Sequence, residues 1–248
     1  MGLAAIRQPV RAVIFDMDGL LVDTGPIWRT VGNGLFASLG VDISALAASG
    51  VAKGMSVGDA MAVFRAYAGW GPTDHADLED RVVAEMVAAI RGGAQLKPGA
   101  LAALEFCDHH GLPAALASGS TLPIIEAVLD HVDLADRFAV VCSAADEAWG
   151  KPHPAIFLRP AAELATPPAS CLVVEDAVTG CIAGKAASMR VVAVPDGAGV
   201  GDPRFAVADA VLSSLEELWT PWVLELLGLP PVPAGDRPAT TSGRRPAP

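Results

Sequence analysis

The chain has 248 residues, of which 52% are hydrophobic, which is enough to form one large domain or one domain with an insert. No apolar run approaches the roughly 18 residues that cross a bilayer, and the N-terminus lacks a secretory signal pattern, so we expect a cytoplasmic protein without membrane contact. The formal net charge of −11, without a basic stripe, excludes nucleic acid as an expected partner.

Short apolar runs alternate with longer amphipathic segments along the chain. The runs predicted as strands are, in chain order, Ala12 to Phe15, Leu112 to Ala117, Ala139 to Cys142, Cys171 to Val174, Val191 to Val194 and Ala210 to Leu212. Because these runs are apolar on both faces, they suit the interior of a parallel sheet that is covered by helices on each side. The predicted fold is therefore α/β, with a doubly wound, mostly parallel sheet.

A long stretch without a clear strand separates the first two runs. Helical periodicity within it predicts several helices, at roughly 27–39, 57–68 and 77–90. We interpret residues 24–96 as an inserted α-helical domain, called the cap below, with residues 1–23 and 97–229 forming the core. Residues 230–248 are rich in Pro, Gly, Ser and Thr and are predicted to be a disordered tail.

Polar residues follow four of the predicted strands, at the point where each strand ends. They are Asp16 and Asp18 after the first run, Ser118 and Gly119 after the second, Lys151 after the third, and Glu175 and Asp176 after the fourth. The carboxyl ends of parallel strands share one edge of an open sheet, and ligands bind at that edge. We therefore expect these segments to meet in one cleft.

The acidic residues of this cleft predict a divalent cation. Asp16, Asp18, Glu175 and Asp176 would repel one another at a partly dehydrated sheet edge, and some would have to protonate without compensation. Mg²⁺ removes this repulsion, since it prefers carboxylate, carbonyl and water oxygens and keeps positions for phosphate. The alternative for Glu175 and Asp176 is to cap the helix that begins near Ala177.

The remaining groups can bind and transfer a phosphoryl group. The Ser118 hydroxyl, the Gly119 amide and the Lys151 ammonium can bind an anion. Asp16 can attack phosphorus as a nucleophile, and Asp18 in its neutral form can protonate the departing oxygen. The alternatives are a simple turn at the two aspartates and a solvated loop lysine at position 151.

The segments DMDGLLVDT, ASGS, KPHP and VVEDAVTG, in this order and with a helical insert after the first, resemble the haloacid dehalogenase superfamily. The resemblance covers about Val10 to Leu218 and extends to the β-phosphoglucomutase-like phosphatases with a helical C1 cap. Within that group, LLVDTGPIW and DPRFAVADAVLSSLEEL look most like the bacterial hexitol and 2-deoxyglucose-6-phosphate phosphatases. The resemblance implies a Mg²⁺-dependent phosphatase that acts on a small-molecule phosphomonoester, a sugar or polyol phosphate. We expect the protein to be a monomer.

The resemblance also implies a role for each motif residue. The catalytic pair is again Asp16 as nucleophile and Asp18 as general acid and base, and the phosphate ligands are Ser118 and Lys151. The implied metal ligands are Asp16, the backbone carbonyl of Asp18, and Asp176 with Glu175 beside it.

Cap residues could complete the substrate site. Trp28, Lys53 and Ser56 are candidates to face the sugar, and packing within the cap or exposure to solvent is an equal alternative. Asp23 is a candidate to contact the substrate or Asp18, and capping of the first cap helix is its alternative.

Three departures from the family pattern bear on the reaction. Gly25 replaces an acidic residue that relatives often carry, and the β-phosphoglucomutases place a histidine where this chain has Trp28 and an arginine near Val57. Without that histidine and that arginine, a sugar bisphosphate would be poorly held and its hydroxyl poorly activated, so hydrolysis is favoured over mutase chemistry. A mutase or phosphotransferase is the second interpretation, and a phospho-aspartate signalling module is the third.

Overall fold

A computed structural model describes residues 8–233 and 235 of the chain. Its sheet has the strand order β3-β2-β1-β4-β5-β6, and each neighbouring pair is parallel. The strands are β1 (Ala12–Phe15), β2 (Ala114–Ser118), β3 (Val140–Ser143), β4 (Cys171–Glu175), β5 (Arg190–Ala193) and β6 (Ala210–Val211). The α/β class and the parallel sheet predicted from the apolar runs are confirmed, with strand ends shifted by one or two residues.

Helices fill the segments between these strands. The α-helices are α1 (Gly25–Ser38), α2 (Ser44–Ala48), α3 (Val57–Tyr67), α4 (Leu78–Ile90), α5 (Ala100–His110), α6 (Leu122–His131), α7 (Ala155–Glu163), α8 (Val178–Ala186) and α9 (Pro221–Leu227). Short 3-10 helices cover Ala135–Arg137, Ala144–Asp146, Pro168–Ser170, Gly197–Gly199, Pro203–Val207 and Leu215–Trp219.

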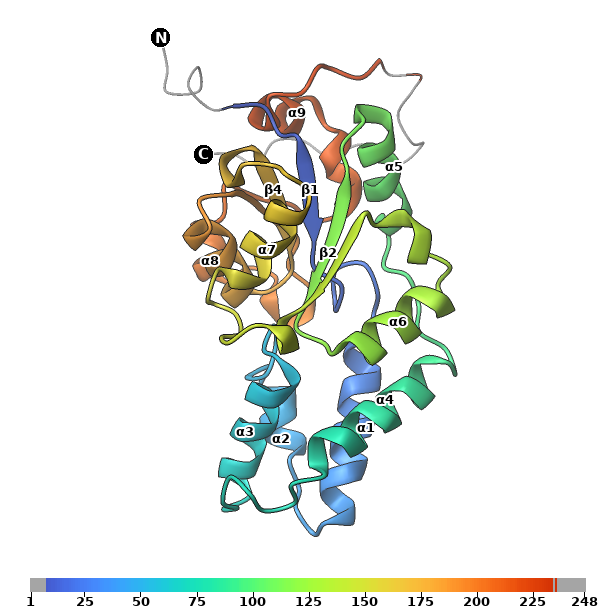
Figure 1. The fold of residues 1–248 in the computed structure, drawn as a ribbon, viewed down its shortest axis with the longest axis vertical. Coiled ribbons are helices and arrows are strands. Elements are labelled where there is room, and N and C mark those ends of the chain that lie inside the picture. The colour runs from blue at the N-terminus through green and yellow to red at the C-terminus, as the bar shows by residue number, and fades with distance from the viewer. Residues whose placement is uncertain (1–7, 234, 236–248) are drawn as a thin grey trace.

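The sheet forms the middle layer of the core. Alternate side chains of a strand point to opposite faces, and those of β1 are all fully buried. Ala12 and Ile14 pack in the apolar cluster that includes α7 and α8, whereas Val13 and Phe15 pack in the cluster that includes α5 and α6. Figure 1 shows these two pairs of helices on either side of the sheet. Burial on both faces explains why β1 is a continuous apolar run.

Helices α1 to α4 lie within residues 24–96 and form the lower part of the molecule in Figure 1. Aromatic packing joins α1 to α3 and the segment after it, since the Phe36 ring lies 5.6 Å from both the Phe64 and the Trp70 rings. The three predicted cap helices are present with ends within two residues, but α2 was not predicted. Its five residues, SALAA, are too few to show helical periodicity, and none of their side chains is buried.

Two adjacent passes of the chain connect the cap to the core. The first leaves β1 and enters α1, and the second leads from α4 to α5. The amide of Asp23 donates to the carbonyl of Gln95 at 2.8 Å, and the amide of Lys97 donates to the carbonyl of Leu21 at 2.8 Å. The two linkers are therefore tied to each other, and a movement of one would carry the other with it.

The predicted disordered tail, residues 230–248, lies largely outside the described residues. In its described part, Val232 is only 2% exposed and belongs to the core cluster. The packed part of the chain therefore extends beyond residue 230.

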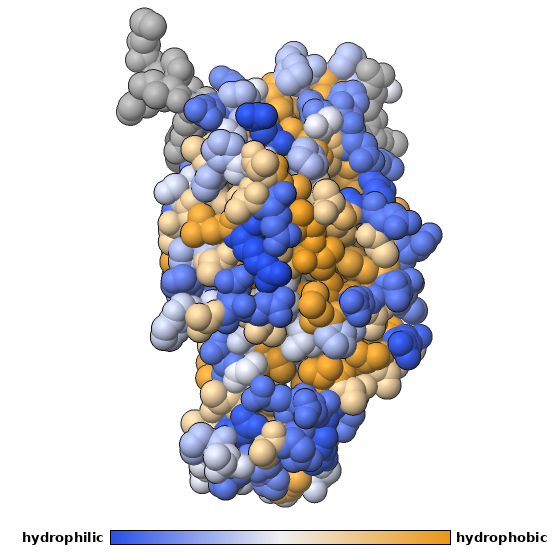
Figure 2. Space-filling model, in the orientation of Figure 1, coloured by the Kyte–Doolittle hydropathy of each residue, from blue (hydrophilic) through white to orange (hydrophobic). Residues whose placement is uncertain are grey.

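The surface shown in Figure 2 is mixed in character. Hydrophilic residues dominate the lower end, where the cap lies, and hydrophobic residues gather near the middle of the view. Within residues 8–233, none of the helices is long and apolar enough to cross a bilayer. All four cysteines, Cys107, Cys142, Cys171 and Cys181, are buried and free.

Candidate active site

The register of the sheet brings together the polar residues that follow the strands. Phe15 of β1 pairs with Leu116 of β2 on one side and with Val174 of β4 on the other. The next residues along the chain, Asp16 and Glu175, therefore lie side by side at the carboxyl edge. Because the strand order reverses between β1 and β4, this edge is the topological switch point at which open α/β sheets bind ligands.

Three buried acids lie together at this edge. Carboxylate oxygens of Asp16, Glu175 and Asp176 are all within 4.8 Å of one another. Burial raises the pKa of Asp16 well above its ordinary value, against the opposing effect of Lys151 and with a further rise from Glu175. Burial likewise raises the pKa of Asp176 to about 7, with Glu175 adding to the rise and Lys53 opposing it. The group is thus short of positive charge.

Lys151 supplies part of that charge from within the protein. Its Nζ lies 2.6 Å from Asp16 Oδ1 and also contacts Glu175 Oε1, and its side chain is 1% exposed. Burial lowers the pKa of Lys151, but Asp16 and Glu175 together raise it above its ordinary value, so the amine stays charged. The alternative of a solvated loop lysine is therefore wrong.

Glu175 has partners for both of its oxygens. Besides the contact of Oε1 with Lys151, Oε2 accepts the amides of Asp176 and Ala177 at 2.8 Å each. Glu175 therefore holds the turn before α8, whose N-cap residue is Ala177.

Asp176 is the acid whose oxygen is left without a hydrogen-bond donor. Its Oδ2 is buried and has no hydrogen-bond partner. Lys53 Nζ lies 2.8 Å from this oxygen and supplies positive charge, but it is not aligned as a hydrogen-bond donor. A buried carboxylate oxygen beside Asp16, with a partly exposed cap lysine as its charge partner, fits a hard divalent cation, which takes oxygen ligands. The residues present are therefore suited to Mg²⁺.

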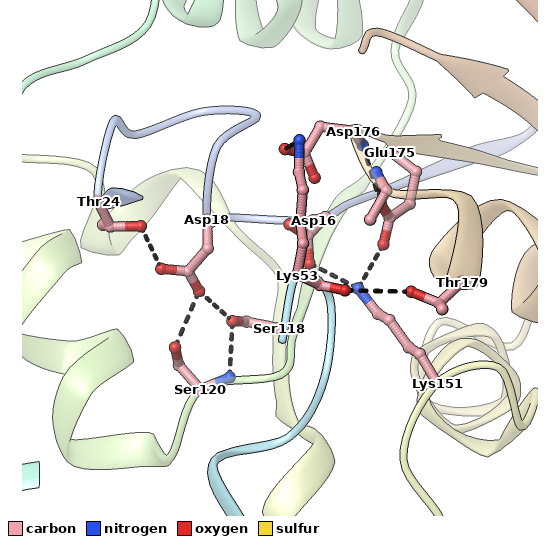
Figure 3. Close-up of polar contacts among 11 residues, drawn as sticks. Asp16, Asp18, Thr24, Lys53, Ser118, Ser120, Lys151, Glu175, Asp176 and Thr179 are labelled. Atoms are coloured by element: carbon pink, nitrogen blue, oxygen red, sulfur yellow. Dashed lines mark hydrogen bonds and ion pairs between the residues drawn. The ribbon is translucent and has the colours of Figure 1, made fainter. Parts of the chain in front are cut away.

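The Asp18 carboxylate faces away from this acidic group, as Figure 3 shows. Its Oδ1 accepts hydrogen bonds from Thr24 Oγ1 at 2.5 Å and from Trp28 Nε1 at 3.3 Å. Its Oδ2 accepts from Ser118 Oγ at 2.9 Å and from Ser120 Oγ at 2.8 Å. Donors from the cap, from the last residue of β2 and from the loop after it thus hold one core carboxylate.

Gly119 lies directly against the cap. A Cβ atom at this position would be 2.4 Å from the backbone carbonyl oxygen of Met55, in the loop before α3. Only glycine permits this approach, because a carbonyl oxygen cannot swing away as a side chain can. The loop after β2 and the loop before α3 therefore close over the site together.

The cap residues proposed from the sequence have different environments. Trp28 reaches Asp18 while also packing against the core cluster, and Lys53 reaches Asp176. The Ser56 hydroxyl accepts the amide of Asp59 at 3.1 Å and donates to its Oδ2 at 2.7 Å, so it caps α3. A contact of Ser56 with a substrate stays a prediction.

Asp23 does not cap α1, because the N-cap residue is Thr24 and the helix start receives no side-chain cap hydrogen bond. Thr24, which is fully buried, and Ser120 were not predicted as site residues. The repeated hydroxyl of the SGS segment was the available signal for Ser120. No comparable pattern marked Thr24, since its role depends on where the cap entry turns back toward Asp18.

Comparison with known proteins gives matches over most of the chain. A family model described as haloacid dehalogenase-like hydrolase matches residues 10–188. Hexitol phosphatase B of Escherichia coli (strain K12) is 39% identical over 211 residues, which are 85% of this chain and 95% of that protein.

Solved structures show the same architecture. CbbY from Rhodobacter sphaeroides, in complex with phosphate, has a TM-score of 0.76 and 28% identity, covering 84% of this chain and 96% of its own. The β-phosphoglucomutase of Clostridium difficile has a TM-score of 0.76 at 24% identity, covering 88% of this chain and 97% of its own, and so shares the fold. The predicted family is confirmed: the chain belongs to the haloacid dehalogenase-like hydrolases and is a phosphatase of that family.

Proposed function

We propose that the chain is a Mg²⁺-dependent phosphatase that hydrolyses small sugar or polyol phosphates through an aspartyl-phosphate. The observation that carries the proposal is the buried contact of Lys151 with Asp16, beside an acidic group that fits Mg²⁺. The similarity to hexitol phosphatase B supports a polyol or sugar phosphate as the substrate class.

The proposed chemistry has two displacements at phosphorus. An Asp16 oxygen bonds to phosphorus while the bond from phosphorus to the alcohol oxygen breaks, and Asp18 gives its proton to that oxygen. Water then attacks the aspartyl-phosphate and Asp18 takes the proton of this water. Free phosphate leaves with Asp16 regenerated. Ser118, the amide of Gly119 and Lys151 hold the phosphoryl oxygens.

The contacts of Asp18 suit a carboxyl group that gains and loses a proton on one oxygen. The Trp28 indole can only donate, so its contact with Oδ1 favours an unprotonated Oδ1. The hydroxyls of Ser118 and Ser120 at Oδ2 can donate or accept, so they can serve both protonation states. The transferred proton would therefore sit on Oδ2, on the side of the phosphate ligand Ser118.

The proposed metal ligands are Asp16, the backbone carbonyl of Asp18, and Asp176 with Glu175 beside it. Bound Mg²⁺ supplies charge that neutralises the phosphoryl oxygens. The rest of the proposed mechanism belongs to side chains and amides of the protein itself.

Mutase chemistry is the second candidate, and the environment of Asp18 disfavours it. The indole of Trp28 lies against Asp18, where the β-phosphoglucomutases carry a histidine. An indole N–H cannot accept a proton, so it cannot help to activate a sugar hydroxyl.

A panel of hexitol, hexose and glycolytic phosphomonoesters tests the proposed function. With Mg²⁺ we expect release of free phosphate, with a preference for polyol or sugar phosphates, and a chelator should abolish that release. NMR of the products separates hydrolysis from isomer formation. Isomeric sugar phosphates without free phosphate would favour the mutase, and undiminished release in chelator would contradict the metal dependence.

Replacing Gly119 with alanine is expected to hold the cap away from the core. The new methyl group would overlap the Met55 carbonyl, and overpacking of this kind costs about 1–3 kcal/mol. If closure is needed for turnover, kcat/KM should fall by about 10- to 100-fold. Gly34→Ala is the matched control, because a Cβ there meets nothing within 4 Å. Equal kcat/KM values for the two variants would contradict the close approach at Gly119.

A further inference from the structure

Lys53 of the cap pairs with a buried carboxylate of the core. Its Nζ lies 2.8 Å from Asp176 Oδ2 and 3.5 Å from the carbonyl oxygen of Asp196. The Lys53 side chain is 36% exposed, whereas that of Asp176 is 2% exposed. Figure 3 shows the lysine reaching from the cap loop to the acidic group. An ammonium group from the cap thus stands at the place where the core needs a cation.

The loop that carries Lys53 is fitted to the core. At Gly54, which has φ of +77°, a Cβ would be 2.6 Å from Thr179 Oγ1 and 3.0 Å from Ala177 Cβ. Thr179 Oγ1 also donates to the carbonyl of Lys53 at 3.5 Å. The backbone of the loop is therefore seated on the start of α8, and the Lys53 side chain needs no rearrangement of the loop to reach Asp176.

The ammonium and a metal ion compete for the same oxygen. Asp176 Oδ2 has no other partner among the described residues, and the Lys53 ammonium gives it charge without an aligned hydrogen bond. A divalent ion bound at Asp176 would repel an ammonium at contact distance. A carboxylate oxygen with one poorly aligned partner is one that a better ligand can take over.

We infer that Lys53 is an internal counter-ion that closes the cap loop over the metal-free site and gives way to the metal. The inference rests on the metal site of the proposed function. In the metal-free protein Lys53 neutralises Asp176 and ties residues 53–55 to the core. Metal binding at Asp176 breaks that tie, so occupancy of the metal site and attachment of the cap loop are linked.

Mg²⁺ titration by calorimetry, without substrate, tests this competition. Lys53→Met removes the charge and keeps the length of the chain, and we expect it to bind Mg²⁺ about tenfold more tightly than the wild type. One charge next to a carboxylate changes its affinity for a proton by about 10- to 1000-fold, and the partial exposure of Lys53 places the effect at the lower end. Lys53→Arg should keep the affinity of the wild type.

Lys97→Met is the matched control for loss of a nearby positive charge. Lys97 pairs with Asp196 Oδ1 at 2.9 Å, at the same rim, but does not contact Asp176. Its loss should change Mg²⁺ affinity by less than about twofold, because water and salt screen a charge beyond contact distance. Thermal unfolding of each variant shows that it is folded.

Hydrogen exchange of residues 50–56 gives a second readout. Without metal, exchange should be faster in Lys53→Met than in the wild type, and Mg²⁺ should speed exchange in the wild type alone. If the wild type binds Mg²⁺ and Lys53→Met binds it with an equal or weaker affinity, the competition is overturned but the proposed metal site is not. A wild-type protein that binds no Mg²⁺ would overturn the proposed metal site and this inference with it.

Discussion

Replacing Asp16 with asparagine is expected to abolish phosphate release from every phosphomonoester while the protein stays folded. The amide is a poor nucleophile, and removal of a catalytic nucleophile costs on the order of 10⁶-fold in kcat. The fold should tolerate the change because asparagine matches aspartate in size and shape, and burial, which raises the pKa of Asp16, already disfavours its charge. Lys151 would keep its contact with Glu175.

Phosphate release measures the loss of activity, and thermal unfolding measures whether the variant stays folded. Asp133→Asn is the matched control, since it makes the same chemical change at an exposed position of the core. It should retain full activity. In the wild type, mass spectrometry of acid-quenched samples should detect the phosphorylated Asp16, and the Asp16→Asn variant should give none. Full activity of the Asp16→Asn variant would contradict the proposed mechanism.

Lys151→Met should have the largest effect on stability as well as a severe effect on activity. Lys151 is buried between Asp16 and Glu175, and removal of one partner of a buried ion pair costs about 3–5 kcal/mol, because the remaining charges stay uncompensated. Because Lys151 is also a proposed phosphate ligand, its loss should reduce kcat by about 10²- to 10³-fold.

Urea unfolding in chelator gives the free energy change. Mg²⁺ should restore part of the stability of Lys151→Met, because it supplies positive charge to the same acids. Lys185→Met is the comparison variant: Lys185 pairs with Asp209 at 2.7 Å but is 31% exposed, so its loss should cost about 1 kcal/mol or less. Equal losses of stability in the two variants would mean that Lys151 is not holding the acidic group together.

The sequence was sufficient to predict the sheet and the meeting of the motifs. An apolar run such as Ala12 to Phe15 must be buried on both faces of a sheet. This requirement does not depend on which strands or helices pack against the run. Once the strands are parallel, residues that follow different strands meet at one edge, and Lys151 does contact Asp16 and Glu175. Strand ends were predicted less accurately, since hydrogen bonding rather than hydropathy adds Ser118 to β2 and Glu175 to β4.

No pattern in the sequence predicted how the cap is positioned over the core. Ser120 and Thr24 donate to Asp18 because two loops turn toward it. The short helix α2 has no periodic pattern by which it could be predicted. Val232 packs into the core although its neighbours are typical of a disordered segment. Each depends on contacts with residues far along the chain.

The amino-acid sequence by itself therefore determined the fold class, the family and the acids and lysine of the core edge, because strand hydropathy and the geometry of parallel sheets are general. Only the tertiary structure decided which cap residues reach the site. Trp28 meets Asp18 and Lys53 meets Asp176 because residues 24–96 pack against this edge of the sheet. That placement depends on paired linkers and on glycines that permit close approach, so the partner of the Lys53 charge became visible only in three dimensions.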